Sequence, residues 1–411
     1  MTAPRPRSHP RFLSTSAFLA ASSLASGVLA APCPTNLPNA IYGAGGSAVT
    51  NTLGAVARAL ASLPPEQAVT IFYNDPGACA GYAHFVAPEI SQPDYFWYWP
   101  ADGDPVQCEP SGDEELSFAH MGNTPLLCPG GENLPAGFGR YVAPVQTINV
   151  ITHAASSEDS IAAEALYHIY GFGPGAVGRS VAPWIEAADV YGRRTSSFVH
   201  QIVANVTGVP SGSFKIPEDN FLRTNDETVA AVFLKGQTSA NRPLGYVSGS
   251  AADAGEGRGE VKTLAYRDFD QTCAYLPHSS RERKDNYNTR TGQYALWTPA
   301  WFYAKTASDG EIAHPVVSEL IGWFDGTSEA PGGLDVVELV IQAGDVPLCA
   351  MRAIRPDGDL SAIASYAPEN PCNGYYEFVK TGQTDYVSCT DSTGCDEAEG
   401  EQCRYGFCEA Y

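Results

Sequence analysis

The sequence predicts an α/β fold that ends in a small disulfide-rich segment. Strand-like and helix-like segments alternate from Ile41 to about Tyr266, and such alternation is typical of chains that build a parallel sheet covered by helices. The 411 residues allow one large or two medium domains. The last four cysteines, from Cys389 to Cys408, lie in a segment with almost no aliphatic residue. Such a segment needs disulfides to hold a shape.

A secretory signal peptide is predicted over residues 1–30. The stretch up to Arg11 carries three arginines and no acid, and an apolar, alanine-rich run follows it. The residues Val28-Leu29-Ala30 fit the small-residue cleavage site of such peptides. We therefore expect the mature chain to begin near Ala31 and to be exported, to the periplasm or to the cell exterior. A buried N-terminal helix is the alternative, and the charge asymmetry argues against it.

The composition disfavours several functions. The 46 acidic residues outnumber the 24 lysines and arginines, which gives a net charge of −22, and such a charge repels nucleic acid and anionic lipid. No later run approaches the ~20 apolar residues of a membrane helix. The eleven cysteines include no Cys-x-x-Cys pair and the histidines are scattered, so disulfides are expected and a metal or other cofactor is not. Because the number of cysteines is odd, at least one is unpaired or pairs between chains.

The first part of the mature chain shows the pattern of a strand, a helix and a second strand. Ile41-Tyr42 ends a strand-like run, and residues 43–47 form a glycine-rich turn. Residues 49–60 have the apolar spacing of a helix, which Pro64-Pro65 stops. Val69 to Tyr73 is the second strand. A helix that connects two strands in this way predicts that the strands are parallel.

The remaining chain adds further elements. Helices are predicted at residues 160–170, 196–206, 225–235 and 315–326, and strands at 145–151, 244–247 and 261–266. The residues Ser156 to Asp159 are expected to cap the first of these helices. From Pro88 to Gly139 the chain is rich in proline, glycine and acids. We expect this stretch to be irregular and on the surface, with Cys108 and Cys128 as a candidate local bridge.

Six passages of the chain form an ordered set. They are Gly43-Ala44-Gly45-Gly46-Ser47-Ala48-Val49, Val69-Thr70-Ile71-Phe72-Tyr73, Gly77-Ala78-Cys79-Ala80-Gly81, Arg193-Arg194-Thr195-Ser196-Ser197, Pro243-Leu244-Gly245-Tyr246-Val247 and Gly292-Gln293-Tyr294-Ala295-Leu296-Trp297. Together they resemble the phosphate-binding branch of the type 2 periplasmic binding proteins, which serve ABC transporters. The resemblance extends from about Pro38 to Ala304.

The resemblance implies two α/β lobes with parallel sheets and a ligand held in the cleft between them. Residues 31–145 and 271–375 would form lobe I, residues 146–270 lobe II, and residues 376–411 a cysteine-rich C-terminal segment. The chain would cross between the lobes near residues 145–152 and 264–272. Such a protein is not an enzyme. It captures a small anion such as phosphate, and its partner is the permease of an ABC transporter.

The candidate ligand-binding residues lie in two of these passages. Gly46 and Ser47 precede a predicted helix, whose N-terminal N–H groups and partial positive charge favour an anion. Arg193 offers a guanidinium fork to a tetrahedral oxyanion, and Ser196 and Ser197 add hydroxyls before the next helix. Ser47 can equally serve only as a helix cap, and an arginine before two serines is often only a surface feature. We predict that the two groups face each other across the cleft, with no catalytic residue.

The chain departs from the family at three places in this site. Phe198 and Val199 stand where the family has glycine and threonine, and Ala78 stands where it has serine. The stretch from Ser117 to Thr124 lacks the aspartate that, in the family, accepts the proton of monohydrogen phosphate. Two interpretations remain open: a changed ligand, or a secreted or surface interaction protein that retains the fold without tight phosphate binding. A hydrolase is not indicated, because no Gly-x-Ser-x-Gly or His-Glu-x-x-His motif occurs.

Overall fold

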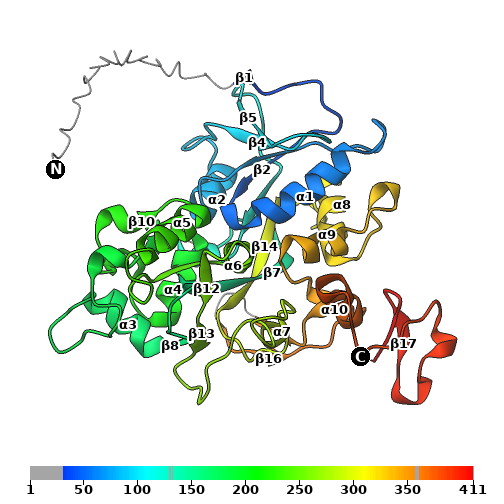
Figure 1. Cartoon of the computed structure of the whole chain (residues 1–411). Helices are drawn as coiled ribbons and strands as arrows, with labels where there is room; N and C mark the ends of the chain where they lie inside the picture. Colours follow the sequence, from blue (N-terminus) through cyan, green and yellow to red (C-terminus); the bar gives the residue numbers. More distant parts are fainter. Residues whose placement is uncertain (1–30, 129–130, 132, 357–360, 411) are drawn as a thin grey trace, which may run out of the picture.

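The computed structural model describes residues 31–128, 131, 133–356 and 361–410. The predicted signal peptide, residues 1–30, lies outside these ranges. Within them, no helix is both long enough and apolar enough to cross a membrane. Figure 1 shows a large sheet through the middle of the molecule, helices on both of its sides, and the C-terminal segment set apart at one edge.

A ten-stranded mixed sheet organises the fold, in the order β1-β5-β4-β3-β2-β6-β14-β7-β11, with β12 also paired to β7. The strands are β1 (Ala31–Pro32), β2 (Ile41–Gly45), β3 (Ile71–Asn74), β4 (Phe96–Tyr98), β5 (Val106–Glu109), β6 (Phe118–Met121), β7 (Phe138–His153), β11 (Gly245–Ser248), β12 (Val261–Thr263) and β14 (Trp297–Lys305). As predicted, β2 and β3 are parallel, and β6 continues this parallel part of the sheet.

The long strand β7 connects two lobes. Its first half pairs with β14, with Val142 opposite Trp301, and its second half pairs with β11 and β12, with Asn149 opposite Val247. We call the part around β2, β3, β6 and β14 the first lobe, and the part around β11 and β12 the second lobe. The predicted α/β class with two lobes and a small disulfide-rich C-terminal segment is thereby confirmed. The expectation of a parallel sheet in each lobe is wrong for the second lobe, because β11 and β12 both pair antiparallel with β7.

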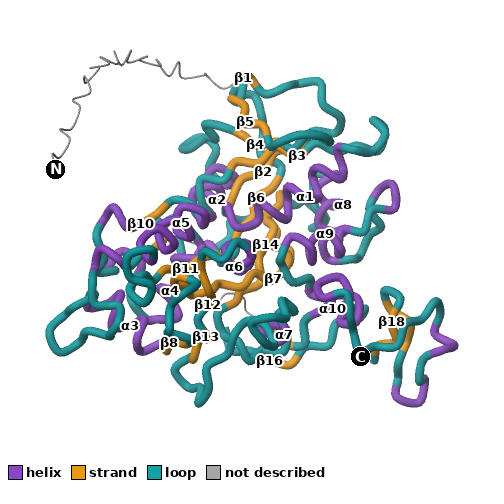
Figure 2. Tube along the Cα trace, viewed as in Figure 1, coloured by secondary structure: helices purple, strands orange, loops and turns teal. Residues whose placement is uncertain are grey.

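Helices cover this sheet on both sides (Figure 2). They are α1 (Thr50–Ala61), α2 (Ala78–Val86), α3 (Ala163–Phe172), α4 (Phe198–Thr207), α5 (Asn225–Gly236), α6 (Gly249–Gly257), α7 (Tyr287–Arg290), α8 (Pro315–Asp325), α9 (Val336–Ala343) and α10 (Asn373–Thr381). Short strands are β8 (Ser160–Ala162), β9 (Gly192–Arg193), β10 (Phe221–Leu222), β13 (Ala265–Arg267), β15 (Ala353–Ile354), β16 (Ala364–Ser365), β17 (Gln402–Arg404) and β18 (Phe407–Glu409). The predicted helices at 49–60, 196–206, 225–235 and 315–326 correspond to α1, α4, α5 and α8.

Two predictions about local structure are wrong. The stretch from Pro88 to Gly139 is not only irregular surface, because it contains β6, whose four residues are all buried between β2 and β14. Four residues that include a histidine give too short an apolar signal to be recognised. The helix α3 begins at Ala163 and has no side-chain cap, because residues 160–162 form β8 and pair with β13. A long-range strand pairing thus replaces the predicted cap.

The disulfide pairing corrects a third prediction. Cys108 pairs with Cys33 and Cys128 pairs with Cys79, so the candidate bridge between Cys108 and Cys128 does not form. The reason is topological: β1 pairs with β5 and places Ala31 opposite Cys108. The other disulfides are Cys349–Cys372, Cys389–Cys403 and Cys395–Cys408. Cys273 is free and exposed, as the odd number of cysteines requires.

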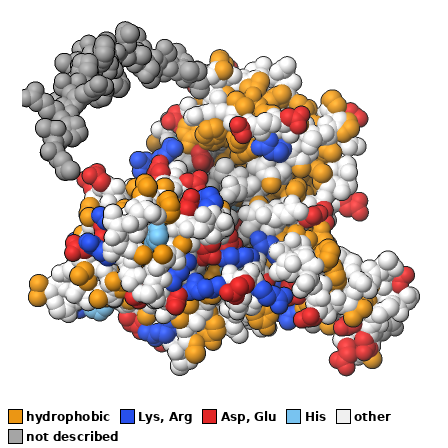
Figure 3. All heavy atoms as spheres, in the orientation of Figure 1, with side chains coloured by type: hydrophobic (Ala, Val, Ile, Leu, Met, Phe, Trp, Pro, Cys, Tyr) orange, Lys and Arg blue, Asp and Glu red, His pale blue; other side chains and the backbone are white. Residues whose placement is uncertain are grey.

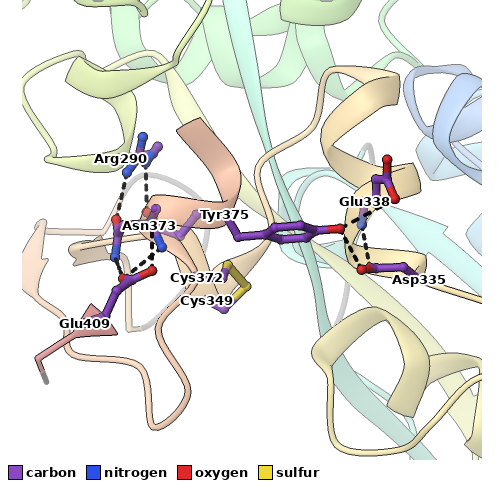
Figure 4. Close-up of a disulfide and its surroundings, with 10 residues drawn as sticks. Arg290, Asp335, Glu338, Cys349, Cys372, Asn373, Tyr375 and Glu409 are labelled. Atoms are coloured by element: carbon purple, nitrogen blue, oxygen red, sulfur yellow. Dashed lines mark hydrogen bonds between the residues drawn. A yellow bond between two sulfur atoms is a disulfide. The ribbon is translucent and has the colours of Figure 1, made fainter. Parts of the chain in front are cut away.

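The C-terminal hairpin β17–β18 is docked against α10 by a buried carboxylate (Figure 4). Glu409 accepts hydrogen bonds from the backbone N–H groups of Asn373 (2.9 Å) and Gly374 (2.8 Å), and so caps the first turn of α10. Arg290 donates to the Asn373 side chain from the other side (2.8 Å). These hydrogen bonds bind the hairpin to α10, whereas the two disulfides, Cys389–Cys403 and Cys395–Cys408, lie within the C-terminal segment itself.

The substitution Glu409→Ala is expected to destabilise the protein by about 1–3 kcal/mol, because it leaves buried N–H donors of α10 without an acceptor. Urea unfolding of purified protein measures this loss. The matched control is Glu399→Ala, which removes an exposed acid from the same segment and is expected to change stability by less than about 0.5 kcal/mol. Equal stabilities of the two variants would contradict the docking role of Glu409.

Candidate functional site

A cavity of about 210 Å³ lies between the two lobes, and all five predicted ligand-binding residues line it. Gly46 and Ser47 belong to the first lobe, and Arg193, Ser196 and Ser197 belong to the second. The two groups come from chain segments about 150 residues apart in the sequence. The fold brings them together at one place.

Three helical segments begin at this cavity. A 3-10 turn, Ser47–Val49, leads into α1, α2 begins after Gly77, and α4 begins after Ser197. At none of the three does the N-cap residue make a side-chain capping hydrogen bond. The start of α5 differs, since Thr224 and Glu227 form a capping box there. The uncapped starts combine partial positive charge with available N–H donors, which favours an anion.

Three hydroxyl groups add further donors. Ser47, Ser196 and Ser197 are half-buried in the wall of the cavity. Within the described chain, none of these hydroxyls hydrogen-bonds to another residue. A hydroxyl can rotate its hydrogen toward a ligand oxygen at little cost. The three predicted serines therefore bring hydroxyl groups without a partner among the described residues to the wall of one cavity.

The guanidinium of Arg193 was predicted to bind the ligand, but in the structure it makes hydrogen bonds within the protein. The side chain is buried and donates to the carbonyl oxygens of Leu222 (3.4 Å) and Arg223 (2.7 Å) and to the side-chain oxygen of Asn225. Burial lowers the pKa of Arg193 to about 10. These contacts use three of the five N–H donors of the group. Arg193 thus fixes the loop after β10, and its predicted ligand contact stays a prediction.

Two arginines that the sequence analysis missed offer positive charge at the cavity. Arg194 and Arg223 are exposed and line its wall. Arg223 follows β10, which pairs with β9 so that Leu222 lies opposite Arg193. That pairing joins residues 29 positions apart and leaves no local sequence signal. Arg194, in contrast, stands beside the predicted Arg193 and could have been included.

Two acids, also missed, line the same cavity. Asp75 follows β3 directly and accepts a hydrogen bond from the Tyr95 hydroxyl (2.6 Å). Burial raises the pKa of Asp75, and Arg223 opposes this rise. Asp94 lies nearby and is exposed. The cavity therefore has acidic and basic groups together, as does the middle of the face in Figure 3.

Comparisons with known proteins give similarity of structure only. The chain matches no protein-family model, and no curated protein is similar to it at a significant level. A putative phosphate ABC transporter substrate-binding protein from Clostridium perfringens aligns with a TM-score of 0.47 and 14% identity, over 75% of this chain and 99% of that one. An ABC-type phosphate transport receptor from Vibrio cholerae gives 0.46 and 15%, over 74% and 99%.

The reduced OxyR regulatory domain from Pseudomonas aeruginosa also aligns, with a TM-score of 0.39 and 8% identity, over 69% of this chain and 95% of that one. Transport receptors and a regulatory domain thus align over similar shares of the chain. A functional conclusion therefore has to rest on the residues around the cavity.

Proposed function

We propose that this protein is an extracytoplasmic solute-binding protein that captures a small phosphate-like oxyanion between its lobes. The observation that carries the proposal is the meeting of three uncapped helical starts, three free hydroxyls and two exposed arginines at one cavity. Each of these groups donates hydrogen bonds or carries positive charge. A desolvated oxyanion needs many fixed donors around it, and the cavity supplies them from both lobes.

The size of the cavity supports a small ligand. Its volume of about 210 Å³ is below the roughly 300–1,000 Å³ of sites that hold drug-sized molecules. The position of Asp75 supports an oxyanion that still carries a proton, because a carboxylate repels a fully ionised anion and accepts a hydrogen bond from a protonated one. We therefore propose a ligand of the size and charge of monohydrogen phosphate.

The cellular role is the second part of the proposal. Five disulfides support an oxidising, extracytoplasmic location. Two lobes joined by a shared strand support ligand capture by hinge closure rather than catalysis. Delivery of the anion to an ABC transporter permease is proposed from this fold class. The alternative, a surface interaction protein that retains the fold, predicts no response to any oxyanion.

A thermal melt of the mature protein with phosphate tests the proposal. Phosphate at about a hundredfold its dissociation constant is expected to add about 2.7 kcal/mol of stability. The substitution Arg194→Gln should reduce this shift, whereas Lys215→Gln, which removes an exposed charge of the same lobe outside the cavity, should not. Arg193→Ala is a poor test, because it also breaks the internal contacts of that side chain. Melts with sulfate and arsenate show whether a proton on the ligand matters.

A further inference from the structure

Phe198 makes an apolar contact between the two lobes. It is the first residue of α4 in the second lobe, and its side chain is only 2% exposed. A Cβ atom placed on Gly122 of the first lobe would lie 2.3 Å from the ring, and one on Gly46 would lie 3.5 Å from it. The ring therefore packs on first-lobe backbone, most closely where Gly122 has no side chain. We call this the Phe198 contact.

Two further observations show that the lobes are closely packed here. A Cβ atom on Gly77 would lie 2.9 Å from the carbonyl oxygen of Ser196, so the backbones of the two lobes approach each other beside the cavity. One buried apolar cluster also includes Ala44 and Ala78 of the first lobe together with Phe198 of the second. The hydrophobic core is continuous across the junction, and the Phe198 ring is a part of it.

We propose that the Phe198 contact holds the lobes closed independently of the ligand. Opening the lobes would expose the Phe198 ring to water. Because burial of apolar surface is favourable by itself, the ring stabilises the closed lobes even when no ligand is bound. In two-lobed proteins that close by a hinge, ligand contacts normally supply the closing interaction. Here an aromatic side chain that also lines the cavity contributes to it. A ligand then enters only during openings in which the Phe198 contact breaks.

Small-angle X-ray scattering of the full mature protein, with and without inorganic phosphate, tests this inference. The wild-type protein is expected to have the same radius of gyration in both conditions. Phe198→Ala is expected to have a larger radius without phosphate and, where phosphate binds, to return to the wild-type value with it. Stopped-flow phosphate binding should be about tenfold or more faster in this variant, because the lost ring burial favours the open state by at least that factor.

Two further variants separate the contact from general damage. Gly122→Ala disturbs the same contact from the first lobe, because its new Cβ atom would overlap the ring, and it should behave like Phe198→Ala. Phe214→Ala is the matched control: Phe214 is buried beside Tyr170 within the second lobe, so its loss should destabilise the protein without changing the radius of gyration. Circular dichroism confirms that each variant is folded.

The inference depends on the proposed function only for its ligand. The inference is overturned if the radius of gyration of the wild-type protein falls on phosphate addition as much as that of Phe198→Ala. It is also overturned if Phe198→Ala and Gly122→Ala are folded and have the wild-type radius of gyration without phosphate. If phosphate binds to neither protein, the oxyanion proposal fails, but the radii without ligand still decide whether the Phe198 contact closes the lobes.

Discussion

The substitution His120→Leu is expected to make the protein markedly less sensitive to acid. His120 lies on β6, is 1% exposed, and has no hydrogen-bond partner for either ring nitrogen among the described residues. Its ring packs against that of Phe302, with centroids 5.1 Å apart. Burial without a partner lowers the pKa of His120 to about 3. The native protein therefore cannot take up this proton until the pH is very low.

The pH window follows from these values. In the unfolded chain the imidazole has its ordinary pKa near 6.5 and takes up a proton below it. Stability is therefore fully present above pH 6.5 and is lost as the pH falls toward 3, by up to about 5 kcal/mol from this residue alone. Urea unfolding between pH 3 and 8 should show a shallower loss of stability on acidification for His120→Leu than for the wild-type protein.

The control for this prediction is Met121→Leu, at a buried residue of the same strand that cannot take up a proton, which should leave the slope of stability against pH close to wild type. His200 contributes equally to the acid sensitivity of the wild-type protein and of His120→Leu, since it is present in both. Its pKa is also lowered by burial, to about 4, but its ring nitrogens lie 2.7 Å from the Tyr246 hydroxyl and 2.9 Å from the Ser211 carbonyl oxygen. Identical acid slopes for wild type and His120→Leu would contradict the assignment.

The substitution Asp345→Asn is expected to have the opposite pH dependence. Asp345 is buried and accepts hydrogen bonds from Thr52 (2.5 Å) and Gln146 (3.4 Å). Burial raises its pKa to about 7, despite the nearby Lys380. The unfolded chain ionises this carboxyl near pH 4, so its contribution to stability is present below that pH and is lost as the pH rises through about 7.

Asparagine keeps the shape of the side chain and cannot ionise. Asp345→Asn should therefore equal the wild-type protein near pH 4 and exceed its stability by a few kcal/mol at pH 8, measured by urea unfolding. Asp385→Asn, at an exposed acid, is the control and should have no such effect. A variant that is less stable than the wild-type protein at pH 8 would show that ionised Asp345 is stabilising.

Local signals in the sequence account for the parts of the fold that were predicted. The helix α1 and the strands beside it follow from apolar spacing and from Pro64-Pro65, and α5 follows from the acids in its first turn. The pairing of β1 with β5 and of β9 with β10 depends on contacts far apart in the sequence. For that reason Cys33, Arg223 and the buried strand β6 could not be placed from local pattern.

The candidate site likewise combines residues that could be predicted from the sequence with contacts that only the folded chain creates. The five predicted residues lie together because a family resemblance supplied the long-range arrangement, not because of their local pattern. Asp75 is not among the predicted site residues, because only the folded chain places it beside Tyr95. Arg193 was predicted to have a guanidinium free to bind the ligand. In the structure its guanidinium instead donates to the carbonyl oxygens of Leu222 and Arg223. Such internal use of donors depends on tertiary structure.

Isothermal titration calorimetry of the mature protein with inorganic phosphate tests the central claim most directly. We predict one binding site per chain, with binding strongly weakened in the double substitution Ser47→Ala and Ser197→Ala, which removes one free hydroxyl from each lobe. The matched control is Ser91→Ala with Ser280→Ala, outside the cavity. Absence of heat with phosphate, sulfate and arsenate, or unchanged binding in the cavity variant, would contradict the claim that this cavity holds an oxyanion.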